Sequence, residues 1–218
     1  MTVYVEKPAV NLREELASLR NQGGYQEQQF WFDSLVTNGT FDSDLSGWVV
    51  SLDNGTNYWR WSSGAARVVS DGTSTNLTQS DVFEVGKRYV VSFDIVATTG
   101  TLKLGTDALA ANIGTSLTTG SYSKTFVATA TALTISRTVG ATDATIDNIS
   151  IYEVDANDDV IHTMPKGWKP KDVFEDGLLQ REGAAHDYEM VYDGFDYIIK
   201  PTVAPSATTQ TCVIGVKA

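Results

Sequence analysis

Short runs in which apolar and polar residues alternate fill the middle of the chain. The alternation is clearest over residues 89–96, where Tyr89, Val91, Phe93 and Ile95 occupy every second position. Because successive side chains of a strand point to opposite faces of a sheet, this pattern predicts a strand with one buried face. The same region is rich in Thr and Gly and has no helical periodicity of useful length. The pattern therefore predicts an all-β sandwich.

The first 34 residues have a different pattern. A short strand-like run precedes Leu12, Leu16 and Leu19, which repeat at helical spacing, and Asn11 with Glu14 forms a capping-box pattern. The predicted helix has roughly ten residues, too few to be stable alone, so its leucine stripe needs a surface to pack on. That surface is either the chain's own β domain or another subunit.

A second β pattern follows an acidic polar linker. The pairs Asp176-Gly177 and Asp193-Gly194 each lie between apolar runs. Such pairs predict hairpins with type I′ turns, because both central positions need a positive φ. With a last strand at residues 211–216, they predict a small β unit. The expected organisation is an N-terminal arm over 1–34, a β-sandwich over 35–155, a linker over 156–171 and a small β domain over 172–218.

Charge and cysteine content exclude several classes of function. The chain has 16 basic and 27 acidic residues, for a net charge of -11. This balance opposes binding to nucleic acid or to anionic lipid, which needs Lys and Arg. No apolar stretch approaches the ~20 residues that would insert into a membrane. Cys212 is the only cysteine and the N-terminus lacks the pattern of a secretory signal, so we expect synthesis in a reducing cytoplasm.

The sandwich region carries a framed motif. It opens with residues 35–42 and Gly47-Trp48, continues through Gln79 and residues 85–94, and closes with residues 145–152. That order resembles the galactose-binding-like β-jelly roll of carbohydrate-binding modules. The resemblance implies a jelly-roll fold, a core position for Trp48, and a function in binding or assembly instead of catalysis.

Carbohydrate-binding modules hold sugars on aromatic faces flanked by polar side chains. Trp59 and Trp61 are the candidates here, with Arg60 between them. Two residues apart on a strand, the two tryptophans point the same way and Arg60 points the other way. The pair can be core, a protein interface or a sugar platform.

Many members of that family also hold a structural calcium ion. Asp147 matches the aspartate of the closing motif, and Asp42 and Asp44 offer further oxygen ligands of the kind that calcium takes. The competing interpretation is that these aspartates form turns and caps. No other cofactor is expected.

Two further resemblances point to bacteriophages. Residues 4–16 are similar to the opening of several phage virion proteins, and residues 172–216 resemble a module of tail-fibre and other virion proteins. A unit this small gains stability when partners cover its edges. The resemblance implies docking through apolar side chains, for which the candidates are Tyr4, Val5, Leu12, Leu16, Leu19, Phe174, Leu178 and Leu179.

Catalytic motifs are lacking. The two histidines lie outside the predicted sandwich, and no nucleophile elbow, zinc-protease or phosphate-loop spacing occurs. Paired carboxylates for glycoside hydrolysis stay open, because their separation in space decides that chemistry.

We therefore expect a non-enzymatic structural protein of the virion, namely a capsid decoration or cement protein. Its partners would be the major capsid protein and further copies of itself, as a homo-oligomer such as a trimer. The alternative is a tail or fibre protein whose jelly roll binds host surface carbohydrate.

Overall fold

The computed structural model describes residues 26–107, 112–183, 185–206 and 208–217. Every regular element in these ranges is a β-strand, so the expected all-β class is confirmed. No helix in the described part of the chain is long and apolar enough to span a membrane. The predicted N-terminal helix and the docking candidates Tyr4, Val5, Leu12, Leu16 and Leu19 lie outside the described residues.

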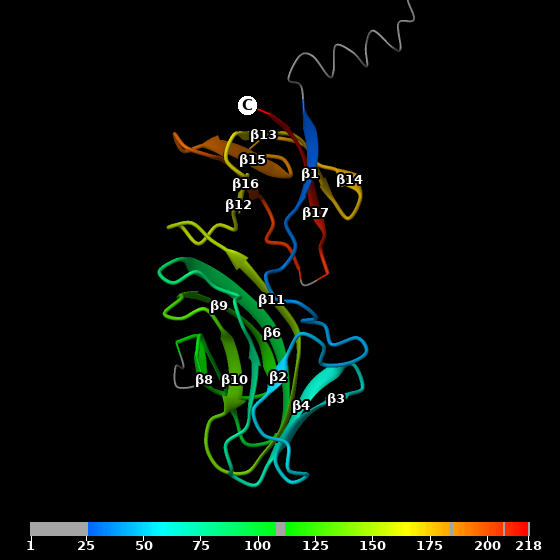
Figure 1. Cartoon of the computed structure of the whole chain (residues 1–218), viewed down its shortest axis with the longest axis vertical. Helices are drawn as coiled ribbons and strands as arrows, with labels where there is room; N and C mark the ends of the chain where they lie inside the picture. Colours follow the sequence, from blue (N-terminus) through cyan, green and yellow to red (C-terminus); the bar gives the residue numbers. More distant parts are fainter. Residues whose placement is uncertain (1–25, 108–111, 184, 207, 218) are drawn as a thin grey trace, which may run out of the picture.

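Two five-stranded antiparallel sheets form the jelly roll, the lower part of the molecule in Figure 1. The first sheet has the order β2 (Val49–Val50), β5 (Asn76–Gln79), β10 (Leu133–Arg137), β7 (Leu102–Gly105) and β8 (Gly114–Leu117). The second sheet has the order β3 (Tyr58–Ser62), β4 (Ala65–Ser70), β11 (Thr142–Glu153), β6 (Arg88–Thr99) and β9 (Gly120–Val127).

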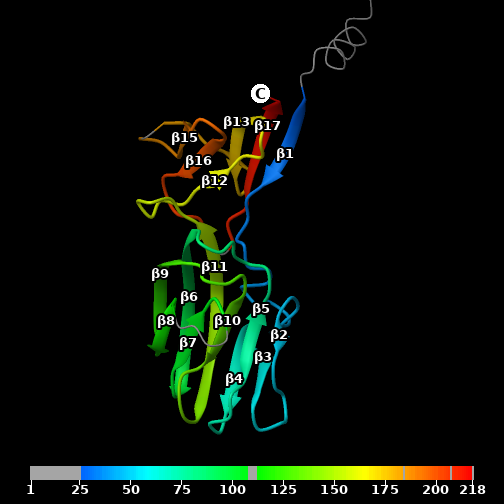
Figure 2. The ribbon, with the colours of Figure 1, turned by 60° about the vertical axis from the view of Figure 1, so that its left-hand side comes forward.

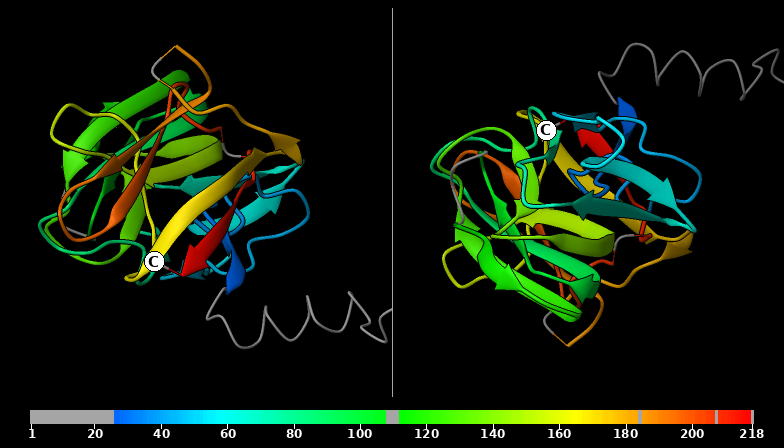
Figure 3. Two further views of the ribbon diagram at one scale, coloured as in Figure 1. Left: turned by 90° about the horizontal axis from the view of Figure 1, so that it is seen from above. Right: turned by 90° about the horizontal axis from the view of Figure 1, so that it is seen from below.

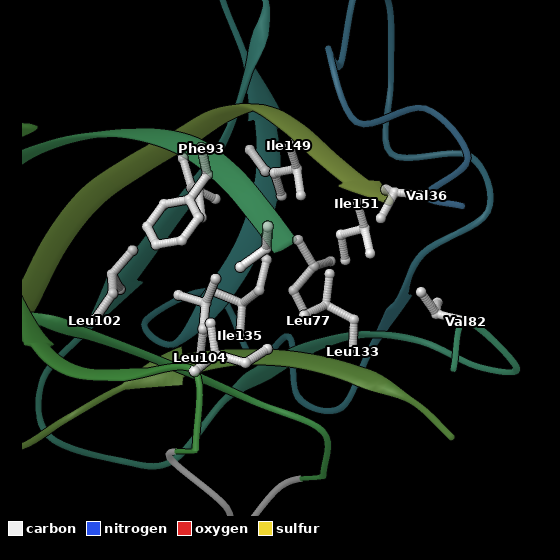
Figure 4. Packing of buried hydrophobic residues seen from close by; sticks show 14 of the residues in the cluster. Val36, Leu77, Val82, Phe93, Leu102, Leu104, Leu133, Ile135, Ile149 and Ile151 are labelled. Atoms are coloured by element: carbon white, nitrogen blue, oxygen red, sulfur yellow. The ribbon is translucent and has the colours of Figure 1, made fainter. Parts of the chain in front are cut away.

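The core lies between these sheets. In Figure 4, Phe93 and Ile149 extend from the second sheet toward Leu104 and Ile135 of the first. The alternation over 89–96 is confirmed, since the side chains at positions 89, 91, 93 and 95 are at most 2% exposed. Trp48 is buried as expected, and its indole N–H donates to the carbonyl oxygen of Thr37 (3.2 Å).

The two ends of the framed motif lie side by side. The amide of Leu35 donates to the carbonyl oxygen of Ile151 (3.0 Å), and the amide of Ile149 donates to that of Gly39 (2.9 Å). A β-carbon on Gly39 would lie 2.1 Å from the carbonyl oxygen of Ile149, so only glycine fits there. Gln79 ties the opening segment to β5, because its side-chain oxygen accepts from the Thr37 amide (2.9 Å).

A second, smaller β unit forms the upper part of the molecule, and a turned view separates its sheets (Figure 2). One sheet has the order β1 (Glu27–Trp31), β17 (Thr211–Lys217), β13 (Trp168–Glu175) and β14 (Leu178–Leu179). The other has the order β12 (His162–Thr163), β16 (Tyr197–Pro201) and β15 (Tyr188–Tyr192). Its core is built from Met164, Val173, Tyr188, Ile199 and Val213.

Three features of this C-terminal unit differ from the sequence expectation. The linker expected over 156–171 contains β12 and the start of β13. Strand β1 comes from the segment assigned to the arm, yet it pairs along its whole length with β17. The first Asp-Gly turn is of the expected kind, with φ of 48° at Asp176 and 80° at Gly177. In the second turn only Gly194 has a positive φ, and four residues separate the paired Tyr192 and Tyr197, so this loop is not a type I′ turn.

The two parts are in direct contact. The Tyr152 hydroxyl donates to the carbonyl oxygen of Ser206 (2.7 Å), and Lys200 pairs with Asp155. Figure 3 looks along the long axis from both ends, onto the C-terminal unit in one view and onto the jelly roll in the other. The contact brings a loop of the C-terminal unit to the outer face of the second jelly-roll sheet.

Candidate functional site

A β-bulge in β11 shapes the outer face of the second sheet. The pairing of β11 with β6 shifts register between Asp147 and Ser150. Within this bulge Asn148 has a φ of 53°, a left-handed conformation that Asn adopts more readily than most residues. The bulge turns the Asn148 side chain toward β6, where its amide nitrogen donates to a carboxylate oxygen of Asp94 (2.8 Å).

Asp94 and Asn148 lie in a groove between the jelly roll and the C-terminal unit. We call it the polar groove, and its volume is about 400 Å³. The loop residues Ala204, Pro205, Ser206 and Thr208 of the C-terminal unit form one wall. The polar side chains of the jelly-roll wall are Ser92, Asp94, Ser121, Tyr122, Asn148 and Ser150.

The carboxylate of Asp94 is held in its ionised form. A hydrogen bond from the Ser121 hydroxyl, and then the one from Asn148, lower the pKa of Asp94 below its ordinary value. Its neighbour Asp147 has a raised pKa, chiefly because of burial, with smaller contributions from the charges of Asp94 and Asp42. The negative charge of the groove and its surroundings disfavours an anionic ligand.

The polar groove offers hydrogen-bonding groups of both kinds. Asp94 has about four acceptor positions, of which Ser121 and Asn148 use two. Serine hydroxyls donate and accept, and the Asn148 amide also does both. Pro205 and Ala204 add apolar contact area. Such an arrangement fits an uncharged polyhydroxylated molecule, whose hydroxyl groups likewise donate and accept.

The tryptophans expected to bind sugar do not lie in this groove. Trp59 is 2% exposed, and its indole N–H donates to the carbonyl oxygen of Thr75 (3.3 Å), so it has no free ring face. Trp61 is 44% exposed and donates to the carbonyl oxygen of Phe41 (2.7 Å). Arg60 points to the opposite face and pairs with Asp53 (2.8 Å). These three side chains therefore do not form one platform.

Asp42 and Asp147 lie near enough for their charges to interact, but the aspartates proposed for calcium do not form a group of three ligands. Asp44 accepts hydrogen bonds from the Ser46 amide (2.8 Å) and from Asn38, as a turn aspartate does. Asp147 accepts from the amide of Asn148. Among the residues that the structure describes, no three His, Cys, Asp or Glu side chains are grouped so as to hold a metal ion. The geometry thus gives no support to a calcium site formed by Asp42, Asp44 and Asp147.

The docking candidates of the C-terminal unit lie at one edge of its larger sheet. Leu178 and Leu179 form the edge strand β14 and are 71% and 61% exposed. Phe174 is partly buried and lies opposite Leu179. The structure brings these three residues together on one hairpin.

Neither Asp94 nor Asn148 was among the site residues predicted from the sequence. A signal was present in each case, because Asp94 is a charged residue within an apolar strand, and Asn148 interrupts the alternation of the closing motif. The sequence alone did not reveal the bulge in β11, which places the two side chains against each other.

No protein-family model matches the chain. A search of curated proteins also found no match. Among solved structures, the N-terminal cellulose-binding domain of β-1,4-glucanase C from Cellulomonas fimi is 20% identical, covers 55% of this chain and 97% of its own, and has a TM-score of 0.42. A domain of bacteriophage CBA120 tailspike protein 4 is 17% identical, covers 56% of this chain and 21% of its own, and has a TM-score of 0.40.

A third structure is TmCBM61, solved in complex with β-1,4-galactotriose. It is 18% identical over 56% of this chain and 99% of its own, with a TM-score of 0.37. These neighbours are carbohydrate-binding modules and a phage tailspike domain. The likeness concerns the fold of about half of the chain, and no functional residue is transferred from it.

Proposed function

We propose that this chain is a non-enzymatic binding protein whose jelly roll binds an uncharged saccharide in the polar groove. The observation that carries the proposal is the pair formed by Asp94 and Asn148 in that groove. The Asp94 carboxylate and the Asn148 amide are hydrogen-bonded to each other, so an acceptor and an amide group lie side by side in the groove. Two neighbouring hydroxyl groups of a pyranose could bind both at once.

Charge supports a neutral ligand. Asp94 is ionised, Asp147 and Asp42 lie near enough for their charges to interact, and the chain carries a net charge of -11. Three arginines on the outer face of the second sheet, Arg60, Arg67 and Arg88, are paired with Asp53, Asp143 and Asp158. A carboxylated or sulfated glycan would therefore be repelled at this face, whereas a neutral one would not.

A calorimetric titration tests this function. Immobilised neutral oligosaccharides would first identify a ligand, which would then be titrated into the full chain and into D94N and D143N variants. Asp143 is a matched control, because it lies on the same strand face as Asp147 but pairs with Arg67 outside the groove. We expect D94N to weaken binding by about tenfold or more and D143N to leave it unchanged. Equal affinities of all three proteins would refute the proposal.

A second function, attachment to a larger assembly, is favoured by the exposed leucines of β14. An edge strand with unpaired backbone groups and two apolar side chains is a docking surface in natural proteins. In this proposal the C-terminal unit attaches the protein to a phage particle, and the jelly roll faces outward with its groove. The resemblance of residues 172–216 to virion modules supports this arrangement, in which the chain is either a capsid decoration protein or a tail protein that binds host carbohydrate.

A further inference from the structure

A second groove lies on the C-terminal unit, away from the jelly roll. Its lining includes four aromatic side chains, and its volume is about 270 Å³. We call it the aromatic groove. The side chains that form it are Lys166, Trp168, Tyr192, Phe195, Asp196 and Tyr197.

The hairpin between β15 and β16 fixes three of these aromatic rings. Tyr192 and Tyr197 are paired across the strands, with ring centroids 4.9 Å apart. The loop between them is held by Asp193, whose carboxylate accepts hydrogen bonds from the amides of Phe195 (2.8 Å) and Asp196 (2.9 Å). The backbone of Phe195 is therefore held in place, and its side chain is 83% exposed. Together with Tyr192, which is 57% exposed, it presents aromatic ring surface to solvent at the groove.

Trp168, the first residue of β13, also lines the aromatic groove. Its ring packs edge-on against Phe30, with centroids 5.1 Å apart. The preceding Gly167 has a φ of 80°, which turns the chain into the strand. The indole therefore packs against the core of the C-terminal unit and also lines the groove.

The polar groups of the groove restrict its ligand. One carboxylate oxygen of Asp196, Oδ1, is buried without a hydrogen-bond partner among the described residues. The residue itself is only partly buried and lines the groove, so its carboxylate can accept a hydrogen bond from a ligand there. The lysines nearby argue against a cationic ligand, because the ammonium groups of Lys217 and Lys169 lie 5.1 and 5.8 Å from the ring centroids of Trp168 and Tyr197.

We propose that the aromatic groove is a second saccharide-binding site, separate from the polar groove. A pyranose presents C–H faces that stack on aromatic rings and hydroxyl groups that donate to a carboxylate. Tyr192 and Phe195 supply the exposed rings, Asp196 accepts a hydrogen bond from a sugar hydroxyl, and Lys166 donates one to a ring or hydroxyl oxygen. A proline-rich peptide would also stack on the rings, but proline has no backbone N–H to satisfy Asp196.

This inference goes beyond the proposed function, since it concerns another unit of the chain and other residues. A polymeric glycan that occupied both sites of one chain would also bind more tightly than at either site alone, because binding at the first site raises its effective concentration at the second.

The test uses the full chain with the D94N substitution, which weakens the proposed jelly-roll site, so that the differences among further variants report on the aromatic groove. Neutral trisaccharides of glucose, galactose and N-acetylglucosamine are titrated into this protein while tryptophan fluorescence is followed. Binding of at least one of them is expected, and adding Y192A, F195A or D196N should weaken it by about tenfold. V203A is the control, because Val203 is exposed in the same unit and does not line the groove.

Three results would overturn the inference. One is that none of the trisaccharides binds at millimolar concentration, and another is that binding persists unchanged in Y192A, F195A and D196N. The third is that an oligoproline peptide binds and loses affinity in Y192A, whereas the sugars do not bind. Because D94N is present throughout, failure here is distinct from failure of the polar groove. Tyr192 and Phe195 are exposed, so we expect their substitution to leave the fold intact, which unfolding of each variant checks.

Discussion

Asn148 donates its side-chain amide to Asp94 across 2.8 Å, from a backbone position with a φ of 53°. The two residues are 54 positions apart in the sequence. Their contact exists because β11 bulges where it pairs with β6. A packing feature of the fold thus creates the polar pair on which the proposed function depends.

Replacement of Asn148 separates the roles of its backbone and its side chain. Glycine tolerates a positive φ, so N148G should keep the bulge and change the free energy of unfolding by less than about 1 kcal/mol. The amide that aligns Asp94 is lost, and we expect saccharide affinity to fall by about tenfold. Urea unfolding and calorimetry on the same preparation measure both effects. Unchanged affinity in N148G would show that the amide plays no part in binding.

Gly39 should be essential for the fold. An added β-carbon would lie 2.1 Å from the carbonyl oxygen of Ile149, so G39A must displace the opening segment from β11. We expect a loss of roughly 3 kcal/mol or more in the free energy of unfolding. G55A is the control, because Gly55 has a φ of 84° and open space around it. That variant should lose only about 1 kcal/mol, the cost of a left-handed alanine. Equal losses in the two variants would contradict the steric argument.

Stability should fall in mild acid because of His162. This side chain is 4% exposed and stacks on Phe32, with ring centroids 5.1 Å apart. Burial lowers its pKa from 6.5 to about 4. Because the pKa of His162 is lower in the folded chain than in the unfolded chain, the unfolded chain binds the proton first as the pH falls. Stability is full above pH 6.5, and about 3 kcal/mol is lost as the pH falls to 4.

Unfolding measured between pH 7 and pH 4 checks this prediction. H162F retains an aromatic ring against Phe32 and should remove the loss, whereas substitution of the exposed His186 by glutamine is the control. The comparison of H162F with the native chain isolates His162 from the carboxylates that titrate in the same range. A native slope that persists in H162F would assign the acid sensitivity to other groups.

The two tryptophans of β3 should behave differently. W59A removes a fully buried ring and should cost about 3–5 kcal/mol of stability. W61A removes a partly exposed ring and one hydrogen bond, for a cost of about 1 kcal/mol. Neither residue lines the polar groove, so W61A should bind saccharide with native affinity. A large loss of affinity in W61A, with stability preserved, would restore Trp61 as a sugar platform.

The leucines of β14 should matter for assembly and not for folding. Leu178 and Leu179 are exposed, so the L178D/L179D double variant should unfold within about 0.5 kcal/mol of the native chain per substitution. If β14 is the attachment edge, this variant should no longer be incorporated into particles assembled in its presence. V191D is the control, placed on an edge strand of the other sheet. Normal incorporation of the double variant would exclude β14 as the docking surface.

Local patterns in the sequence were sufficient to predict some of the strands. The alternation around Phe93 and the Asp176-Gly177 turn depend only on neighbouring residues, and both are as expected. The pairing of β1 with β17 was not predictable in this way, because the two strands are about 180 residues apart and no local pattern indicates that they pair.

The candidate sites were less predictable than the fold. Aromatic residues were a reasonable guide to sugar binding, but the sequence does not distinguish a ring in the core, such as Trp59, from a ring on the surface, such as Phe195. Both grooves are formed by segments distant in the chain, and the polar groove also needs the contact between the two parts of the molecule.

The central claim is that the polar groove binds a neutral saccharide, and amide chemical-shift mapping by NMR tests it most directly. The full chain is titrated with the neutral oligosaccharide that binds best. The account predicts saturable shifts at Asp94, Ser121 and Asn148, with a second group of shifts around Tyr192 and Phe195 if the aromatic groove is also a site. Shifts confined to the surroundings of Trp61, or no saturable shifts with any neutral oligosaccharide, would contradict it.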